Sequence, residues 1–87
     1  MAELILFWAS WCLACKSMEK MIPELKFEGI EIKSFNVDKN FKMADDYKIQ
    51  SVPTCLFLRD GNEVARLVGA RTKDGIRNWI EKLSGGD

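Results

Sequence analysis

The sequence predicts an α/β fold whose elements follow the order strand, helix, strand, helix, strand, strand, helix. Three observations carry this prediction: a continuous apolar run near the first residue, later stretches with apolar residues at helical spacing, and an Asp-Gly pair between two strand-like runs. A strand, helix and strand in succession favour a parallel pair, whereas an Asp-Gly hairpin adds antiparallel strands. We therefore expect a mixed sheet.

Size and composition fit a single domain over residues 1–87. Of the 87 residues 47% are hydrophobic and 30% charged, so a disordered or multidomain chain is not expected. Thirteen basic and thirteen acidic residues leave no net charge and no basic stripe, so nucleic acid is not an expected partner. The apolar run 4–9 is too short to span a bilayer, and Glu3 stands where a signal peptide needs a basic start. We expect a cytoplasmic protein without a membrane segment.

The first strand and helix come from the apolar pattern at the start of the chain. Residues 4–8 are continuously apolar, which predicts a strand buried on both faces. Pro23 lacks a backbone donor and clashes with the preceding turn, so we expect the following helix to bend or break there. A helix over about residues 12–26 is predicted by apolar residues three or four positions apart, namely Cys15, Met18, Ile22 and Leu25.

The middle of the chain predicts a second strand and a short helix. Residues 30–37 begin by alternating apolar and charged side chains, as expected of a strand with one partly solvated face. After a turn over residues 38–40, the stretch 41–47 holds good helix formers. Its apolar and aromatic residues recur three positions apart, at Phe41, Ala44 and Tyr47.

The last third predicts a hairpin followed by a helix. Strand-like runs over residues 54–58 and 63–68 flank Arg59-Asp60-Gly61-Asn62, and an Asp-Gly pair in this position is a strong hairpin signal. Thr72 is the expected N-cap of the final helix, which Gly85-Gly86 should end. The inward stripe of this helix is predicted to be Ile76, Trp79, Ile80 and Leu83.

The candidate chemistry lies in the pair Cys12 and Cys15. Cys12 falls where the first strand gives way to the helix, so its sulfur is expected near unpaired backbone N–H groups and the positive end of the helix dipole. A thiolate, the form that attacks disulfides, is stabilised in such a position. Cys15 projects from the same helical face one turn later, where it can resolve a mixed disulfide with Cys12.

Two other interpretations of this pair need no redox catalysis. In the first interpretation, the two cysteines form half of a zinc site. Zinc prefers four ligands, however, and the chain has no histidine and only Cys55 as a further cysteine. Alternatively, both cysteines would be small core residues, since free cysteine is often buried. The neighbouring Trp11 and the position at a helix start argue against this second interpretation.

The segment Phe7-Trp8-Ala9-Ser10-Trp11-Cys12-Leu13-Ala14-Cys15-Lys16 resembles the active-site segment of thioredoxins, and Val52-Pro53-Thr54 resembles their cis-proline loop. Asn36-Val37-Asp38, Asp60-Gly61 and Val68-Gly69-Ala70 resemble further landmarks in the same order, so the likeness runs from about Leu4 to Leu83. The resemblance implies a minimal thioredoxin-like fold, β-α-β-α-β-β-α around a central four-stranded mixed sheet. The usual first strand and helix of full-length thioredoxins look absent.

The resemblance also implies a function. It predicts an enzyme-like electron carrier of cell redox homeostasis, a thiol-disulfide oxidoreductase that reduces protein disulfides through a reversible Cys12-Cys15 cycle and needs no cofactor beyond that disulfide. Its expected partners are protein disulfides and an electron donor of the thioredoxin reductase type, and a monomer is expected. By the resemblance the Val52–Pro53 bond is cis and the backbone before it pairs with substrate. The residues that match the border of the family's apolar groove are Trp11, Leu13, Gly69 and Ala70.

This sequence departs from the family pattern at the site itself. The buried acid that assists proton transfer at the second cysteine falls on Leu6, and its partner lysine falls on Ser34. The usual Gly-Pro between the cysteines is replaced by Leu13-Ala14, so the redox potential cannot be inherited from the family. We interpret Lys16 as a solvated surface charge. Three further residues are interpreted as core side chains: Cys55, Trp8 and Trp79.

Two other functions remain open at this point. A glutaredoxin-like protein using glutathione fits the short length, although the two tryptophans around the motif are more typical of thioredoxins. A non-catalytic binding module would keep the fold and the groove while the thiols stay idle or bind metal. Turnover with glutathione alone tests the first, and partner binding that survives Cys12→Ser tests the second.

Overall fold

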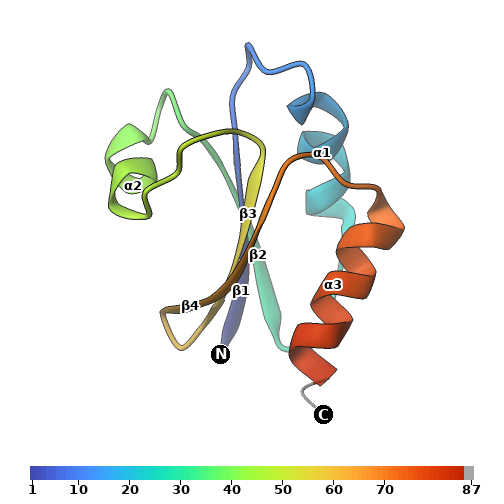
Figure 1. Ribbon diagram of the computed structural model, residues 1–87. Coiled ribbons are helices and arrows are strands. Elements are labelled where there is room, and N and C mark those ends of the chain that lie inside the picture. Colours follow the sequence, from blue (N-terminus) through green and yellow to red (C-terminus); the bar gives the residue numbers. More distant parts are fainter. Residues whose placement is uncertain (86–87) are drawn as a thin grey trace.

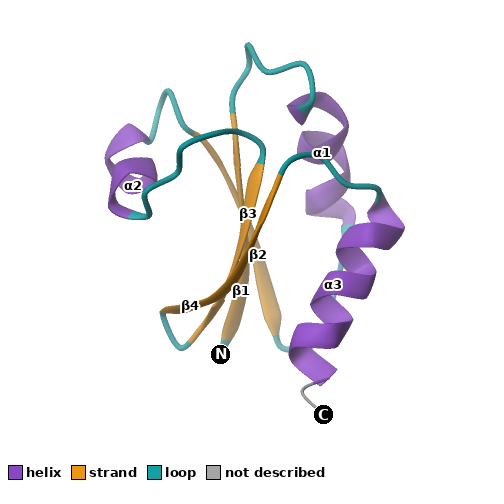
Figure 2. Ribbon diagram, in the orientation of Figure 1, coloured by secondary structure: helices purple, strands orange, loops and turns teal. Residues whose placement is uncertain are grey.

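The computed structural model describes residues 1–85 and confirms the predicted order of elements (Figure 1). Two helices, α1 and α3, lie on one face of a four-stranded sheet, and α2 lies on the other (Figures 1 and 2). The elements are β1 (Ala2–Trp8), α1 (Cys15–Met21), the 3-10 helix η1 (Ile22–Glu24), β2 (Ile30–Asn36), α2 (Phe41–Asp46), β3 (Thr54–Arg59), β4 (Asn62–Val68) and α3 (Lys73–Gly85).

The sheet has the strand order β2-β1-β3-β4, with β1 parallel to β2 and antiparallel to β3, and β3 antiparallel to β4. The predicted mixed sheet is therefore confirmed. Because side chains alternate across a strand, β1 sends Leu4 and Leu6 to the core under α1 and α3, and Ile5 and Phe7 to the core under α2. This explains why its sequence is continuously apolar.

Two residues with positive φ angles form the turn of the hairpin between β3 and β4. Asp60 and Gly61 have φ angles of 53° and 84°, and two positive φ angles in succession are what a tight two-residue hairpin turn requires. Such a turn lets Arg59 pair with Asn62, so each strand extends one residue closer to the turn than the sequence predicts.

The predicted helix over residues 12–26 is wrong at both ends. Before it, the backbone forms turns, with the Cys12 N–H donating to the Ala9 carbonyl at 3.2 Å, and α1 begins only at Cys15. After Met21, one 3-10 turn contains Pro23, and Leu25 is already extended with ψ 141°. Pro23 cannot continue the α-helical ladder, so the expected break there is confirmed.

The remaining helices agree more closely with prediction. Thr72 caps α3, because its hydroxyl accepts the Gly75 N–H at 3.1 Å. Ile76 and Ile80 are fully buried, and Trp79 and Leu83 pack against them half-buried. The helix reaches Gly85, while Gly86, named in the predicted helix end, lies outside the described residues. The second strand and α2 each end one residue before the predicted end.

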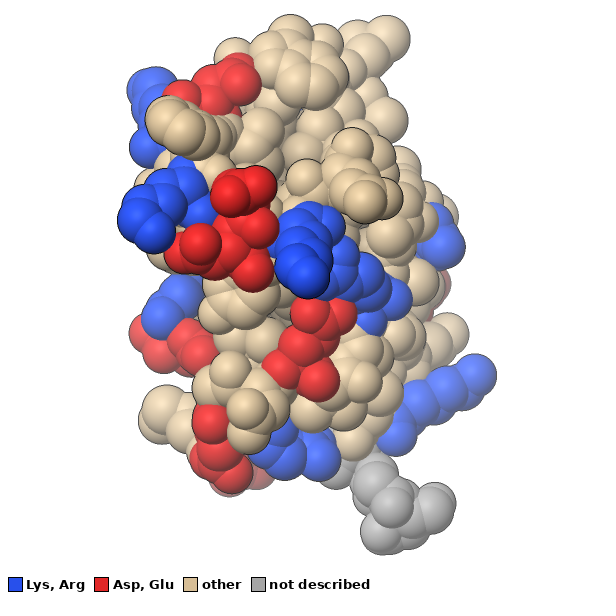
Figure 3. Space-filling model, turned by 60° about the vertical axis from the view of Figure 1, so that its left-hand side comes forward, with Lys and Arg blue, Asp and Glu red and all other residues tan. Residues whose placement is uncertain are grey.

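Charge is spread over the surface in both signs. On the face drawn in Figure 3, acidic and basic side chains lie next to one another from the upper left to the lower end, and the upper right is uncharged. The upper end of the molecule is where β1 leads into α1 (Figure 1). Among the described residues, no helix is long and apolar enough to cross a membrane.

Candidate active site

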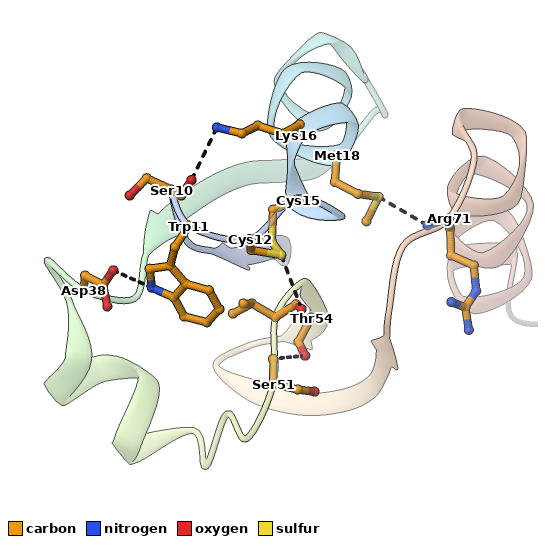
Figure 4. The surroundings of a disulfide bond; sticks show 11 residues. Ser10, Trp11, Cys12, Cys15, Lys16, Met18, Asp38, Ser51, Thr54 and Arg71 are labelled. Atoms are coloured by element: carbon orange, nitrogen blue, oxygen red, sulfur yellow. Dashed lines mark hydrogen bonds between the residues drawn. A yellow bond between two sulfur atoms is a disulfide. The ribbon is translucent and has the colours of Figure 1, made fainter.

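The structure joins Cys12 and Cys15 in a disulfide at the end of the sheet where β1 leads into α1 (Figure 4). Their Cα atoms are 5.3 Å apart, within the usual range for a disulfide. The two residues differ in exposure. Cys12 retains 7% of its accessible surface, whereas Cys15 retains 0%. Both are thus buried, Cys12 less completely than Cys15.

The backbone around Cys12 is a turn and not the first turn of the helix. The Cys15 N–H donates to the Cys12 carbonyl and the Lys16 N–H to the Leu13 carbonyl, each at 3.2 Å. Cys12 thus lies one turn before α1, three residues earlier than a helix-start position. Since a helix dipole acts mainly within the first turn, its effect on Cys12 is weaker than the sequence predicts. Lys16 is exposed, with its ammonium 3.3 Å from the Ser10 carbonyl oxygen.

The loop before β3 faces the disulfide. The Val52–Pro53 peptide bond is cis, and the Val52 carbonyl oxygen lies 3.6 Å from the Cys12 sulfur. In the reduced form, this carbonyl is within reach of the Cys12 S–H group. The loop is held in place, since the Thr54 hydroxyl donates to the Ser51 carbonyl at 2.7 Å and the Gly69 N–H donates to the Pro53 carbonyl at 2.8 Å.

The Gly69–Ala70 loop is tied both to this proline and to α1. Gly69 has φ 99°, a conformation that favours glycine. The following Arg71 backbone N–H donates to the sulfur of the buried Met18 at 3.5 Å (Figure 4). The Arg71 guanidinium donates to the carbonyls flanking Gly69, those of Val68 and Ala70. The loop that the sequence singles out is therefore adjacent to Pro53 because of tertiary hydrogen bonds.

Two apolar side chains next to the cysteines project into solvent. Trp11 is 69% exposed and Leu13 is 85% exposed. The indole N–H of Trp11 donates to the Asp38 carboxylate at 2.8 Å, which fixes one edge of the ring (Figure 4). Sequence reasoning gave Asp38 no role. Two signals were available: its place in Asn36-Val37-Asp38, which resembles a family landmark, and its position just after β2, the parallel neighbour of β1. Parallel strands end at the same edge of a sheet.

A hollow of about 130 Å³ lies beside Trp11, between α2 and the loop before the cis-proline. Val37 and Val52 line it and also pack against the cluster that holds both cysteines. The sequence predicted Trp11 and Val52 as site residues but missed the rest of the lining, which is Val37, Ala44, Ile49, Gln50 and Ser51. These residues carry no chemical signature and become neighbours only through the fold.

The two positions that match the family's ion pair carry no charge in this chain, and they differ in burial: Leu6 lies in the core, whereas Ser34 is exposed. Leu6 is fully buried, and its neighbours across the sheet are Ser34 on β2 and Cys55 on β3. Cys55 is also fully buried, and burial raises the pKa of its thiol to about 12, so it stays protonated near neutral pH. Among the described residues, no three His, Cys, Asp or Glu side chains are grouped so that they could hold a metal ion.

A disulfide between cysteines three residues apart, set at the end of a central strand of this α/β fold, is typical of thiol-disulfide oxidoreductases. Comparison with known proteins places the chain in the same class. The thioredoxin family model matches residues 2–82. The thioredoxin of Chlamydia pneumoniae is 38% identical over 81 residues, which cover 91% of this chain and 79% of that protein. A thioredoxin of Staphylococcus aureus is 34% identical over 83 residues, 92% of this chain and 80% of the relative.

Solved structures give the same result. A mutant thioredoxin from Halobacterium salinarum NRC-1 superposes with a TM-score of 0.83 at 29% identity, covering 93% of this chain and 73% of that one. The chain belongs to the thioredoxin family. It is a thiol-disulfide oxidoreductase with a redox-active cysteine pair, and members of this family act through their own disulfide without a cofactor.

Proposed function

We propose that the protein reduces protein disulfides with Cys12 as the attacking thiolate and Cys15 as the resolving thiol. The difference in exposure between the two residues supports this assignment, since Cys12 is 7% exposed and Cys15 is 0% exposed. A bulky disulfide can approach only a sulfur that reaches the surface. The fully buried Cys15 is protected from outside reagents and is already held next to its partner.

The cycle transfers two electrons in two exchange steps. The Cys12 thiolate attacks one sulfur of the substrate, the substrate S–S bond breaks, and the released thiolate takes a proton from solvent. The Cys15 thiol then loses its proton and attacks Cys12 in the mixed disulfide, which releases the second substrate thiolate and leaves the Cys12–Cys15 disulfide. An external dithiol donor, which we propose to be a reductase of the thioredoxin reductase type, restores the reduced form.

We propose that substrate binds as an extended segment across the surface around Cys12. The backbone at Val52 would pair with this segment as an added strand, and the 3.6 Å distance from its carbonyl oxygen to the Cys12 sulfur supports this. The hollow of about 130 Å³ beside Trp11 suits one apolar side chain, since a cavity of roughly 150 Å³ accommodates benzene. Four residues would complete this surface: Leu13, Pro53, Gly69 and Ala70.

The assignment of roles is tested by insulin reduction with three proteins: wild type, Cys12→Ser and Cys15→Ser. We expect wild type to reduce insulin with dithiothreitol as donor and both variants to lose this activity. Only Cys15→Ser should accumulate a mixed disulfide with its substrate, because it attacks but cannot resolve. Trapping by Cys12→Ser instead would reverse the two roles, and no activity in wild type would refute the proposed function.

The domain organisation, oligomeric state and location of the protein are also proposals. We propose that residues 1–87 work as one domain, as a monomer and in the cytoplasm. The single four-stranded sheet that joins all the described strands supports one domain. Turnover with a flavoprotein or ferredoxin-dependent reductase, compared with turnover with glutathione alone, identifies the electron donor. Sedimentation velocity measures the oligomeric state.

A further inference from the structure

An aromatic side chain stands in solvent at the start of α2 without a role in the fold. Phe41 is 75% exposed, although a large apolar side chain is stabilised by burial. The residues by which α2 packs on the sheet are others, namely Met43, Ala44 and Tyr47. As the first residue of the helix, Phe41 also offers no capping group. The packing of this chain therefore does not explain why the Phe41 side chain is exposed, and an exposed apolar side chain can mark an interaction site.

Phe41 borders an open hollow that continues into the one beside Trp11. This larger hollow measures about 680 Å³, and its apolar lining includes Val37, Ala44 and Ile49. The same three residues line the 130 Å³ hollow at Trp11, which adjoins the disulfide cluster. The two hollows thus share an apolar lining, to which the smaller adds Trp11 and the larger adds Phe41. We call this continuous surface the Trp11–Phe41 groove.

The charges around the Trp11–Phe41 groove largely satisfy one another. The Asp38 carboxylate accepts the Trp11 indole N–H at 2.8 Å, and Lys42 pairs with Asp46 at 3.6 Å on α2. The two other charged residues that line the hollows at Phe41 are of opposite sign, Lys39 and Asp45. A strongly charged partner gains little on such a surface, whereas an uncharged apolar segment buries the exposed ring.

We propose that Phe41 is a specificity-determining residue that anchors an apolar side chain of protein substrates, farther from the attacked disulfide than the one beside Trp11. The occupant is an extended, uncharged segment that flanks the reactive cysteine of the substrate. Continuity of the groove with the disulfide cluster argues for a substrate segment there, because whatever reaches Cys12 already lies over the Trp11 end. This inference rests on the proposed function and adds a second contact to it.

The test compares Phe41→Ser and Phe41→Leu with wild type on three probes. These are insulin, the small disulfide of thionitrobenzoate, and a pair of synthetic peptide disulfides that differ only in leucine or serine several residues from the cysteine. We expect Phe41→Ser to lower kcat/KM about five- to tenfold for insulin and for the leucine peptide, mainly through KM. The serine peptide and the small disulfide should react at the wild-type rate, and Phe41→Leu should restore most of the loss.

The matched control is Val64→Ser, which removes an apolar side chain that is 46% exposed on β4 and lines none of the described hollows. It should leave all probes unchanged. Equal rates for Phe41→Ser and wild type on every probe overturn the inference, as does a loss that extends to the small disulfide. A wild-type dimer that Phe41→Ser dissociates in sedimentation also overturns it, since a second copy then covers the ring. A wild type inactive toward the small disulfide refutes the proposed function instead.

Discussion

Burial of Cys55 makes the stability of the fold depend on alkaline pH in a way that can be calculated. Burial raises the pKa of this thiol from 9.0 to about 12, and the side chain is 0% exposed. Between these two values the unfolded chain releases the proton and the folded chain keeps it. The contribution of this thiol to stability is therefore complete below pH 9.0 and is lost as pH rises toward about 12.

The magnitude follows from the two pKa values. One proton released only on unfolding lowers the free energy of unfolding by about 1.4 kcal/mol per pH unit. Relative to neutral pH, the loss attributable to Cys55 is then about 1.4 kcal/mol at pH ~10 and about 2 kcal/mol at pH ~10.5. A thiol whose pKa is unchanged by folding would show no loss at all.

The assay is urea unfolding of two matched proteins between neutral pH and pH ~10.5. The first carries Cys12→Ser and Cys15→Ser, so that Cys55 is the only thiol and disulfide exchange within the chain is impossible. The second carries Cys55→Ala in addition. The cavity left by alanine lowers its stability by the same amount at every pH, so only the pH-dependent part of the difference reports ionisation.

We expect the stability difference between the two proteins to shrink as the pH rises, because only the protein with Cys55 loses stability through thiol ionisation. A difference that stays constant over this range would contradict the reasoning. It would mean that Cys55 ionises as readily in the folded protein as in the unfolded one, and hence that the core under the active site admits water.

Three further predictions concern the resolving step, a helix cap and an ion pair. Leu6→Asp places a carboxylate at the core position that matches the family's buried acid, and stopped-flow reduction should show the Cys15 step about tenfold faster near neutral pH. Equal rates reject the idea that the Cys15 step is slowed by the lack of a carboxylate at this position. Thr72→Ala removes the N-cap of α3 and should lower the free energy of unfolding, measured with urea, by about 1 kcal/mol. An unchanged urea midpoint would show that the cap does not stabilise the fold. Arg66 holds the pKa of the Glu63 carboxyl below its ordinary 4.5, so this ion pair stabilises the fold above that pH and stabilises it less as the pH falls. Glu63→Gln should therefore make the free energy of unfolding depend less on pH in the acid range, and an unchanged dependence refutes a stabilising role for the pair.

Agreement between sequence and structure is best where the determining interactions are local. The Asp60-Gly61 turn required only two residues able to adopt positive φ, and both do. Thr72 was recognisable as a cap from its place before a helical stripe, and it accepts the expected N–H. The error at α1 has the opposite origin. The apolar stripe continues through residues 22–25, but Pro23 ends the α-helical hydrogen bonding and leaves Leu25 buried in an extended conformation.

The amino-acid sequence alone determines the elements, the cysteine pair and the side chains that must be buried, because periodicity, turn chemistry and residue spacing act over a few neighbouring residues. It does not say which distant segments meet. The strand order β2-β1-β3-β4 brings the ends of β1 and β2 and the start of β3 to one end of the molecule, and only there do Asp38 and Val52 reach Trp11 and Cys12. These segments come together because both faces of β1 are buried, one in each of two hydrophobic clusters. Residues far apart in the chain contribute to each cluster, so this burial is a long-range effect.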